Sequence, residues 1–268
     1  MYKINYHMHT TFSPDAENTP EEMVLASADA KIDEICFTDH FECNGNSSIP
    51  EGFTLWPEFQ LDKYYAAISS LKDSPICVKV GIELGQVTQN KPLAEKVLAS
   101  YPWDFVLGSL HNLSNQYDFY YIGLQGVDMR PLMHDYFEQL YELAVYNRFS
   151  VLSHLYYPVK YIYRQGKAFD LHKYKAEIAD ILRIVIQNGK GIEINTSALH
   201  CPFKDTVPRL EDIKLYRQLG GEIITVGSDA HSMDAVDNGL DVAYAYLREA
   251  GFKAVSTFKK QKPMFIDI

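Results

Sequence analysis

Thiols are scarce in this sequence, and none are spaced as in a redox or metal-binding motif. The four cysteines are Cys36, Cys43, Cys77 and Cys201, and no two of them form a C-x-x-C pattern. So few cysteines in 268 residues do not make a disulfide framework. They favour reduced thiols in a cytoplasmic protein.

Long apolar runs and runs of basic residues are also absent. No apolar stretch reaches the roughly 18 residues of a membrane-spanning helix, and the first residues lack the pattern of a signal peptide. Lysine and arginine total 25 against 35 aspartates and glutamates, which gives a formal net charge of -10. Because no apolar stretch is long enough, we expect no membrane partner. Because binding to a phosphate backbone usually needs a basic face, we expect no nucleic-acid partner either. The sequence carries no signal for an oligomeric state.

The rest of the composition is that of an ordinary globular protein, with 47% hydrophobic and 22% charged residues. A β/α barrel often has this length, so we expect a single domain over residues 1–268. Short apolar runs alternate with amphipathic stretches, as in parallel strands joined by helices. Seven segments are expected as strands: Ile4–Met8, Glu34–Thr38, Ile76–Leu84, Phe105–Leu110, Ser150–Ser153, Gly191–Asn195 and Glu222–Gly227. The expected helices cover residues 20–31, 57–72, 91–100, 128–147, 170–188, 209–219 and 236–250.

Strand counting predicts a β/α barrel but leaves an open doubly wound sheet as the alternative. The positions of histidine, aspartate and glutamate favour the barrel. All but one of the expected strands contain, or end in, a residue of a type that binds metals. In a barrel the carboxyl ends of all strands converge on one face, so these side chains would meet there. The residues at these ends are His7, His9, Asp39, His40, Glu83, His111, His154, Asp229 and His231.

Two of these strand ends carry ligand types two residues apart. His7 and His9 point to the same side of an extended strand and can present two imidazoles to one metal, while Met8 packs behind them. Asp229 and His231 repeat the spacing with a carboxylate and an imidazole. Six of the nine histidines lie at strand ends, which a random scatter would not produce.

In order and type these residues resemble the polymerase and histidinol phosphatase (PHP) superfamily. The matching segments are His7-Met8-His9 with Asp15, Thr38-Asp39-His40, Gly81-Ile82-Glu83, Gly108 to His111, Ser153-His154 and Gly227 to His231. The resemblance implies a distorted (β/α)7 barrel of the TIM-like type that holds three divalent metal ions. The implied metal ligands are His7, His9, Asp15, His40, Glu83, His111, His154, Asp229 and His231.

The resemblance also implies how these ligands are shared. His7, His9, Glu83 and Asp229 would hold one metal, and Glu83 would bridge to a second metal held by His111 and His154. Asp15, His40 and His231 would hold the third. Imidazole and carboxylate without thiolate suit Zn, Fe or Mn and disfavour a site of Mg or Ca alone.

Within the superfamily the chain is most similar to monofunctional histidinol-phosphate phosphatases. This implies hydrolysis of L-histidinol phosphate to L-histidinol and phosphate, a step of histidine biosynthesis. Two positions depart from many relatives: Tyr156 stands where they have an aspartate, and no arginine closely follows Asn195-Thr196-Ser197. Both departures concern the substrate contacts more than the metals.

A phosphate monoester carries about two negative charges near neutral pH, so its hydrolysis needs charge neutralisation and an activated water. The charge of three divalent ions would exceed that of the three carboxylate ligands. The site would therefore be positive and would suit the phosphate dianion. Guanidinium groups donate two hydrogen bonds to phosphate, and an imidazole can protonate the leaving alkoxide. The residues expected to bind substrate are His40, Arg164, His200 and Arg209, with Glu83, Asp229, His231 and His200 expected to be catalytic. An equally good interpretation is that three of these residues are exposed loop residues without a role in binding: Arg164, His200 and Arg209.

Two other functions remain open. One is a phosphodiesterase or nuclease on the same metals, as in the PHP domains associated with DNA polymerases, but the net charge of -10 weighs against it. The other is a non-catalytic metal-binding module, against which the complete ligand set argues.

Overall fold

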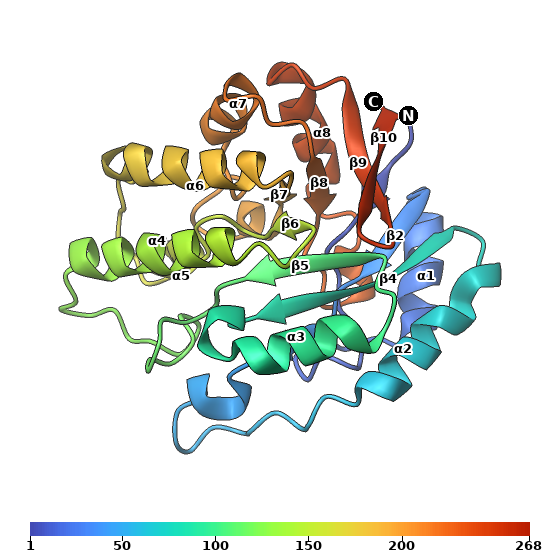
Figure 1. The fold of residues 1–268 in the computed structure, drawn as a ribbon, viewed down its shortest axis with the longest axis horizontal. Helices are drawn as coiled ribbons and strands as arrows, with labels where there is room; N and C mark the ends of the chain where they lie inside the picture. Colours follow the sequence, from blue (N-terminus) through green and yellow to red (C-terminus); the bar gives the residue numbers. More distant parts are fainter.

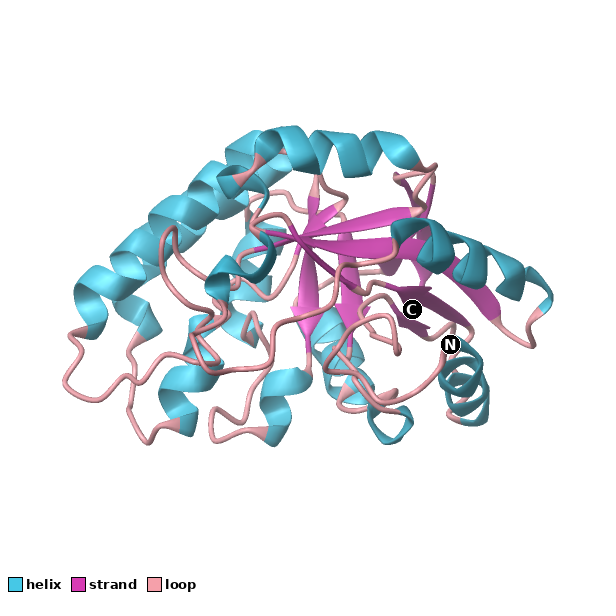
Figure 2. Ribbon diagram, turned by 90° about the horizontal axis from the view of Figure 1, so that it is seen from below, coloured by secondary structure: helices cyan, strands magenta, loops and turns pink.

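Seven parallel strands form a nearly closed barrel in the computed structural model, which describes residues 1–268 (Figures 1 and 2). The strands follow one another around the barrel in chain order: β1 (Ile4–Asn5), β2 (Glu34–Phe37), β4 (Cys77–Gly85), β5 (Phe105–Ser109), β6 (Val151–Leu152), β7 (Gly191–Asn195) and β8 (Ile224–Gly227). Each expected strand is present, and the predicted distorted (β/α)7 barrel is confirmed.

The barrel closes between its first and last strands. The Tyr6 amide donates to the Val226 carbonyl over 2.8 Å, and Met8 and Ala230 form a parallel bridge beyond the strand ends. A short additional strand, β3 (His40–Glu42), follows β2 and pairs with β4. It was not predicted, because three half-buried residues give no apolar run.

Helices surround the barrel, and several begin at a side chain that caps their free amides. Thr19 accepts from the Glu22 amide, and the Glu22 carboxylate accepts from the Thr19 amide, which is a capping box. Two further helices have a simple N-cap, in which Asn90 accepts from the Leu93 amide and Asp128 accepts from the Arg130 amide. The helices are α1 (Pro20–Asp29), α2 (Leu61–Ser70), α3 (Lys91–Ser100), α4 (Met129–Tyr146), α5 (Pro158–Arg164), α6 (Lys175–Gln187), α7 (Leu210–Gln218) and α8 (Leu240–Glu249).

Three helix predictions differ from the structure at their starts. Residues 57–60 and 236–239 are not helical, and residues 171–174 form a short 3-10 turn before α6. The short helix α5 was not predicted, because its seven residues follow β6 closely and are too few for a clear periodic pattern.

An antiparallel hairpin of β9 (Ala254–Lys259) and β10 (Lys262–Asp267) covers the amino-terminal end of the barrel. The Phe258 ring packs 4.9 Å from the ring of Phe105, and the Phe258 amide donates to the Tyr6 hydroxyl over 2.9 Å. Both chain ends lie beside this hairpin in Figures 1 and 2. The sequence did not indicate it, since β10 is largely exposed and shows no alternation.

Two loops form a rim at the other end of the barrel, around the carboxyl ends of the strands. The loop over 43–60 and the loop over 112–127 meet, because the Asp118 amide donates to the Ser48 carbonyl over 2.9 Å. The rings of Phe53 and Tyr121 also pack edge to face at 4.9 Å.

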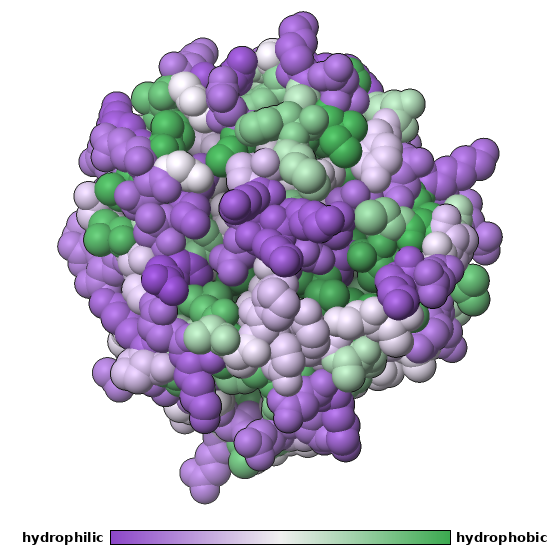
Figure 3. Space-filling view, turned by 45° about the vertical axis from the view of Figure 1, so that its right-hand side comes forward, coloured by the Kyte–Doolittle hydropathy of each residue, from purple (hydrophilic) through white to green (hydrophobic).

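The surface is mixed in character. On the face shown in Figure 3, apolar groups are interspersed with hydrophilic side chains. No helix is both long and apolar enough to cross a membrane.

Candidate metal centre

The nine predicted ligand residues lie together at the carboxyl ends of the barrel strands. Eight of them come from strand ends or the residues just after them, and Asp15 comes from the loop after β1. Seven are largely buried, whereas His231 and Asp15 reach the opening, with side chains 32% and 44% exposed. The cluster is therefore reached from the rim and closed below by the barrel core.

One group of ligand atoms surrounds His7 and His9 at the end of β1. His7 Nε2 lies 3.3 Å from Glu83 Oε2 and 3.5 Å from Asp229 Oδ1. His9 Nε2 lies 3.2 Å from the same Asp229 oxygen and 3.7 Å from Glu83 Oε2. The H-x-H and D-x-H motifs thus face each other across the seam that closes the barrel.

Glu83 turns its second oxygen towards another pair of histidines. Its Oε1 lies 3.1 Å from His111 Nε2 and 3.0 Å from His154 Nε2, and these two nitrogens are 3.2 Å apart. One carboxylate therefore faces two separate groups of nitrogen atoms.

A third group lies nearer the solvent. Asp15 Oδ2 is 3.4 Å from His231 Nε2 and 3.8 Å from His40 Nε2. The other ring nitrogen of His40, Nδ1, points inward to within 2.7 Å of Glu83 Oε2. His40 therefore connects this outer group to the inner ones.

These separations fit ligands that share metal ions. Atoms bound about 2.0–2.1 Å from one tetrahedral zinc lie about 3.3 Å from each other. Three sets of ligand atoms lie within 4.8 Å of one another, and they overlap without matching the three groups above: His7, His9 and Asp229; His9, His40 and His231; and His40, Glu83 and His111. His7 Nε2, His40 Nδ1 and Glu83 Oε2 are buried close to one another, but none of them is aligned for a hydrogen bond, even across the 2.7 Å between the last two. Leaving them unsatisfied is costly unless a cation binds there. The donor set contains nitrogen and oxygen only, which suits zinc and similar divalent ions.

Further carboxylates orient the histidines from behind, and the sequence did not identify them as such. Glu193 on β7 places Oε1 2.6 Å from His7 Nδ1, and its Oε2 accepts from the His154 amide over 3.0 Å. Glu42 on β3 places Oε1 2.8 Å from His111 Nδ1. Such contacts fix the ring tautomer, so that the opposite nitrogen is free to bind metal.

His9 is oriented through a hydroxyl. Its Nδ1 lies 3.2 Å from Ser13 Oγ, which donates to Asp39 Oδ1 over 2.7 Å. Asp39 also accepts from the Thr10 amide, and burial raises the pKa of its carboxyl to about 6. Asp39 is therefore a support for this loop and lies behind the cluster.

The buried charges of the cluster shift one another's pKa values. Burial alone would lower the pKa of His7, but the carboxylates of Glu193, Glu83 and Asp229 raise it well above the usual range. Burial would likewise raise the pKa of Glu83 and Asp229, but the neighbouring histidines hold both well below the usual range. The opposite holds for His9, whose pKa burial and the nearby imidazoles lower. The carboxylates are thus ionised and ready to accept a cation.

The backbone at the end of β8 is shaped for this cluster. Asp229 adopts a positive φ of 57°, which is uncommon for a residue with a side chain, and its amide donates to the His7 carbonyl over 2.8 Å. Gly227 lies so close to β1 that a Cβ there would meet both His7 Cβ and Glu193 Oε1 at 2.3 Å. Only glycine lets the two strands approach this closely.

A buried cation lies beside the cluster, although it was not predicted. Lys160 on α5 is only 13% exposed, and its Nζ lies 3.9 Å from Asp229 Oδ2 and 3.3 Å from Ser197 Oγ. Its ammonium also lies over the rings of Tyr157 and Tyr161, at 5.5 and 5.4 Å. No motif pointed to Lys160, because it belongs to the short helix that the sequence did not indicate.

Two of the other predicted substrate contacts, Arg164 and His200, are exposed. Arg164 is exposed and stacks on the Tyr161 ring at 5.3 Å, so it lies at the rim close to Lys160. His200 is exposed at the end of the turn that follows β7.

Arg209 is not brought to the cluster. Its guanidinium pairs with Glu211 and lies 3.9 Å from Asp212 at the start of α7. Tyr156, at the position of the missing aspartate, donates to Asp212 over 2.9 Å. The structure therefore holds Arg209 and Tyr156 in one network away from the metal ligands.

Asp118 lies in the rim above the cluster. Its Oδ1 accepts from the Tyr157 hydroxyl over 3.2 Å and from the Tyr120 amide over 2.7 Å. Burial raises the pKa of this carboxyl to about 6. The loop over 112–127 thus contributes to the wall of the site.

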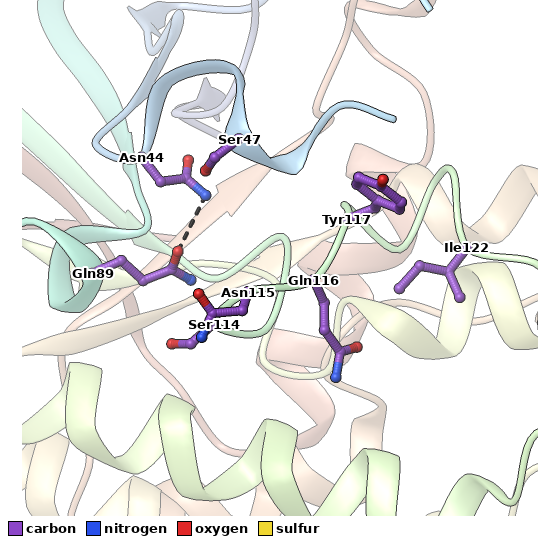
Figure 4. Close-up of a pocket in the computed structure, with 8 residues that line it drawn as sticks. All are labelled: Asn44, Ser47, Gln89, Ser114, Asn115, Gln116, Tyr117 and Ile122. Carbon is purple, nitrogen blue, oxygen red and sulfur yellow. Dashed lines mark hydrogen bonds between the residues drawn. The ribbon is translucent and has the colours of Figure 1, made fainter. Parts of the chain in front are cut away.

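A hollow of about 840 Å³ lies elsewhere on the rim (Figure 4). Asn44 donates to Gln89 over 3.1 Å along one side of it, and uncharged side chains such as Asn115 and Gln116 line the rest. None of the predicted metal ligands lines it, and it offers no charge to a phosphate or an ammonium group.

Known proteins resemble the chain over nearly its full length. The histidinol-phosphatase of Lactococcus lactis subsp. lactis (strain IL1403) is 28% identical over 273 aligned residues, covering 98% of this chain and 96% of that protein. The probable histidinol-phosphatase of Thermotoga maritima is 26% identical over 260, covering 96% and 97%.

A solved structure shares the fold. The crystal structure of histidinol phosphate phosphatase from the same Lactococcus strain, complexed with zinc, L-histidinol and phosphate, superposes with a TM-score of 0.82. It is 24% identical and covers 98% of both chains. The PHP domain family matches residues 5–197, which is well over half of the sequence. The chain therefore belongs to the PHP domain family, as its strand-end ligands predicted.

Proposed function

We propose that this protein is a metal-dependent phosphatase that hydrolyses L-histidinol phosphate to L-histidinol and phosphate, a step of histidine biosynthesis. The observation that carries the proposal is the buried cluster of imidazole and carboxylate atoms, spaced as ligands of shared metal ions. The full-length likeness to proteins named histidinol-phosphatase supports the choice of substrate.

Three divalent ions fit the three groups of atoms. The inner groups are His7, His9, Glu83 and Asp229, then Glu83, His111 and His154, and the outer group is Asp15, His40 and His231. When bound, such ions supply Lewis-acid activation of water and neutralise the charge of the phosphate. The zinc-containing Lactococcus structure makes zinc the first ion to test, with iron and manganese as the alternatives.

The chain's own residues supply the remaining interactions. Lys160 would donate to the phosphate oxygens, because its ammonium lies at the edge of the cluster and the tyrosine rings limit its motion. Arg164 would add a second positive charge at the opening. Asp229 and His231 would move a proton to or from the reacting oxygen, and His200 would be the donor to the leaving alkoxide if substrate draws it inward.

A substrate panel tests the proposal. Metal-replete protein should release phosphate from L-histidinol phosphate much faster than from nucleoside monophosphates or from a diester such as bis(p-nitrophenyl) phosphate. Cleavage of the diester at an equal or higher rate would transfer the assignment to a phosphodiesterase or nuclease. Metal without any hydrolysis would indicate a metal-binding module.

A further inference from the structure

A second hollow, of about 370 Å³, adjoins the metal cluster. It lies between the loop over 43–60, strand β3 and the first loop of the barrel, and His40 belongs to its wall. Its volume falls within the range of small-molecule sites, of which about 300 Å³ is the lower end. A molecule bound to the cluster could therefore extend past His40 into this space.

Trp56 forms an aromatic wall of the hollow. Its ring centroid lies 5.4 Å from that of His40, with the planes tilted by 37°. Two hydrogen bonds of 2.9 Å fix its backbone, since the Trp56 amide donates to Asn46 Oδ1 and Asn46 Nδ2 donates to the Trp56 carbonyl. The ring is thus held in place, although the surrounding loop has no regular structure. Phe41 and Phe59 line the same space.

Carboxylates give the hollow a negative charge. Glu42 is 9% exposed, and while its Oε1 contacts His111, its Oε2 is buried without a hydrogen-bond partner. Glu58 is exposed and lines the hollow next to Trp56. No lysine or arginine lines it. Aromatic faces with nearby carboxylates bind organic cations, through cation–π attraction and ion pairing.

We propose that this hollow binds the cationic end of the substrate, with Trp56 as the platform and Glu42 and Glu58 as the counter-charges. The inference rests on the proposed function. L-Histidinol phosphate carries an ammonium group and an imidazole ring a few bonds from its phosphate. With the phosphate at the cluster and Lys160, these groups would reach past His40 to the Trp56 ring.

A merely structural role for Trp56 predicts something different. If the ring only supported His40, its loss would weaken every ligand of the cluster equally. If it binds the cation, its loss weakens the aminoalcohol and spares the phosphate. Competitive inhibition by each product separates these two roles of Trp56. L-Histidinol carries the cationic groups without a phosphate, whereas inorganic phosphate carries no cationic group.

The experiment uses metal-replete full-length protein with p-nitrophenyl phosphate as the reporter substrate. In Trp56→Ala the inhibition constant of L-histidinol should rise about tenfold, or about 1.4 kcal/mol, with that of inorganic phosphate within about twofold of wild type. Trp56→Phe should retain part of the affinity for L-histidinol, and Glu58→Gln should weaken it severalfold. Phe53→Ala, in the same loop but outside the hollow, is the matched control and should change neither constant.

Two results would overturn the assignment: an unchanged constant for L-histidinol in Trp56→Ala, or a parallel rise for both products. Failure of the proposed function is seen separately. In that case wild-type protein would hydrolyse p-nitrophenyl phosphate but not L-histidinol phosphate, whatever the variants show.

Discussion

Replacing Glu193 with glutamine should weaken metal binding while leaving the fold intact. The Glu193 carboxylate is buried on β7 and lies 2.6 Å from His7 Nδ1. It holds the His7 ring with Nε2 towards Glu83 and Asp229. Glutamine has nearly the same shape, so the variant removes the charge without opening a cavity.

The expected size follows from two independent magnitudes. A hydrogen bond to a charged group contributes about 1.5–3 kcal/mol, which corresponds to a factor of about 10 to 150. Loss of a residue that orients a metal ligand typically costs about 10- to 100-fold in metal affinity or activity. Glu193→Gln should therefore bind Zn²⁺ about 10- to 100-fold more weakly than wild type.

The assay is titration of metal-free protein with Zn²⁺ against a chelating indicator, followed by activity at rising metal concentration. Saturating metal should restore most of the activity, since Glu193 touches no reacting atom. Glu222→Gln is the matched control, because Glu222 is 71% exposed and far from the ligands. The reasoning would be refuted if Glu193→Gln bound Zn²⁺ as tightly as wild type, or if Glu222→Gln lost as much Zn²⁺ affinity as Glu193→Gln.

Three further outcomes follow from the same geometry. Glu83→Gln should lose bound metal at more than one position, by elemental analysis, because both of its oxygens face ligand groups. Lys160→Met should raise KM for phosphate monoesters about tenfold with metal content retained, whereas Arg209→Ala should leave KM unchanged because its guanidinium is paired elsewhere. Asp118 has a pKa of about 6 in the folded protein against an ordinary value of 3.8, so the folded state holds its proton more tightly and stability falls as pH rises between these values. Asp118→Asn should remove that slope from the melting temperature measured between pH 4 and 7 in chelator-treated protein, and parallel curves would contradict it.

Much of the fold could be read from local patterns. The residues of β7 match the expected segment in full, because the β-branched residues Ile192 and Ile194 follow closely on Gly189, which stops the preceding helix. Elements with a weak pattern were missed. β10 is exposed along most of its length and α5 has seven residues, so neither produces the periodicity that identifies a strand or helix.

The candidate ligands could be grouped from the sequence, because barrel topology brings strand ends together whatever their distance along the chain. The residues that lie behind these candidates could not be identified in the same way. Glu193 looks like a polar interruption in a strand, and its partner His7 is 186 residues away. Lys160 looks like an ordinary surface cation until its burial is known. Arg209 was expected at the phosphate because guanidinium suits it, but sequence alone did not show that Glu211 and Asp212 hold it.

The carboxylates behind the cluster also change its charge. Three ligand carboxylates were expected, and the structure adds Glu42 and Glu193 in direct contact with the histidines. If three divalent ions bind, as proposed, their positive excess over the neighbouring carboxylates is correspondingly smaller. This makes the charge of Lys160 more important for a phosphate dianion than the sequence suggested.

The closure of the barrel between β1 and β8 has a consequence for how the protein matures. His9 and Asp229 lie 220 residues apart along the chain, although their side chains are in contact. If the proposed inner metal group forms, it therefore needs both strands in place and cannot be completed before β8 has joined the barrel. Metal would then load late and bind only the closed barrel, which stabilises that state in proportion to the logarithm of metal concentration.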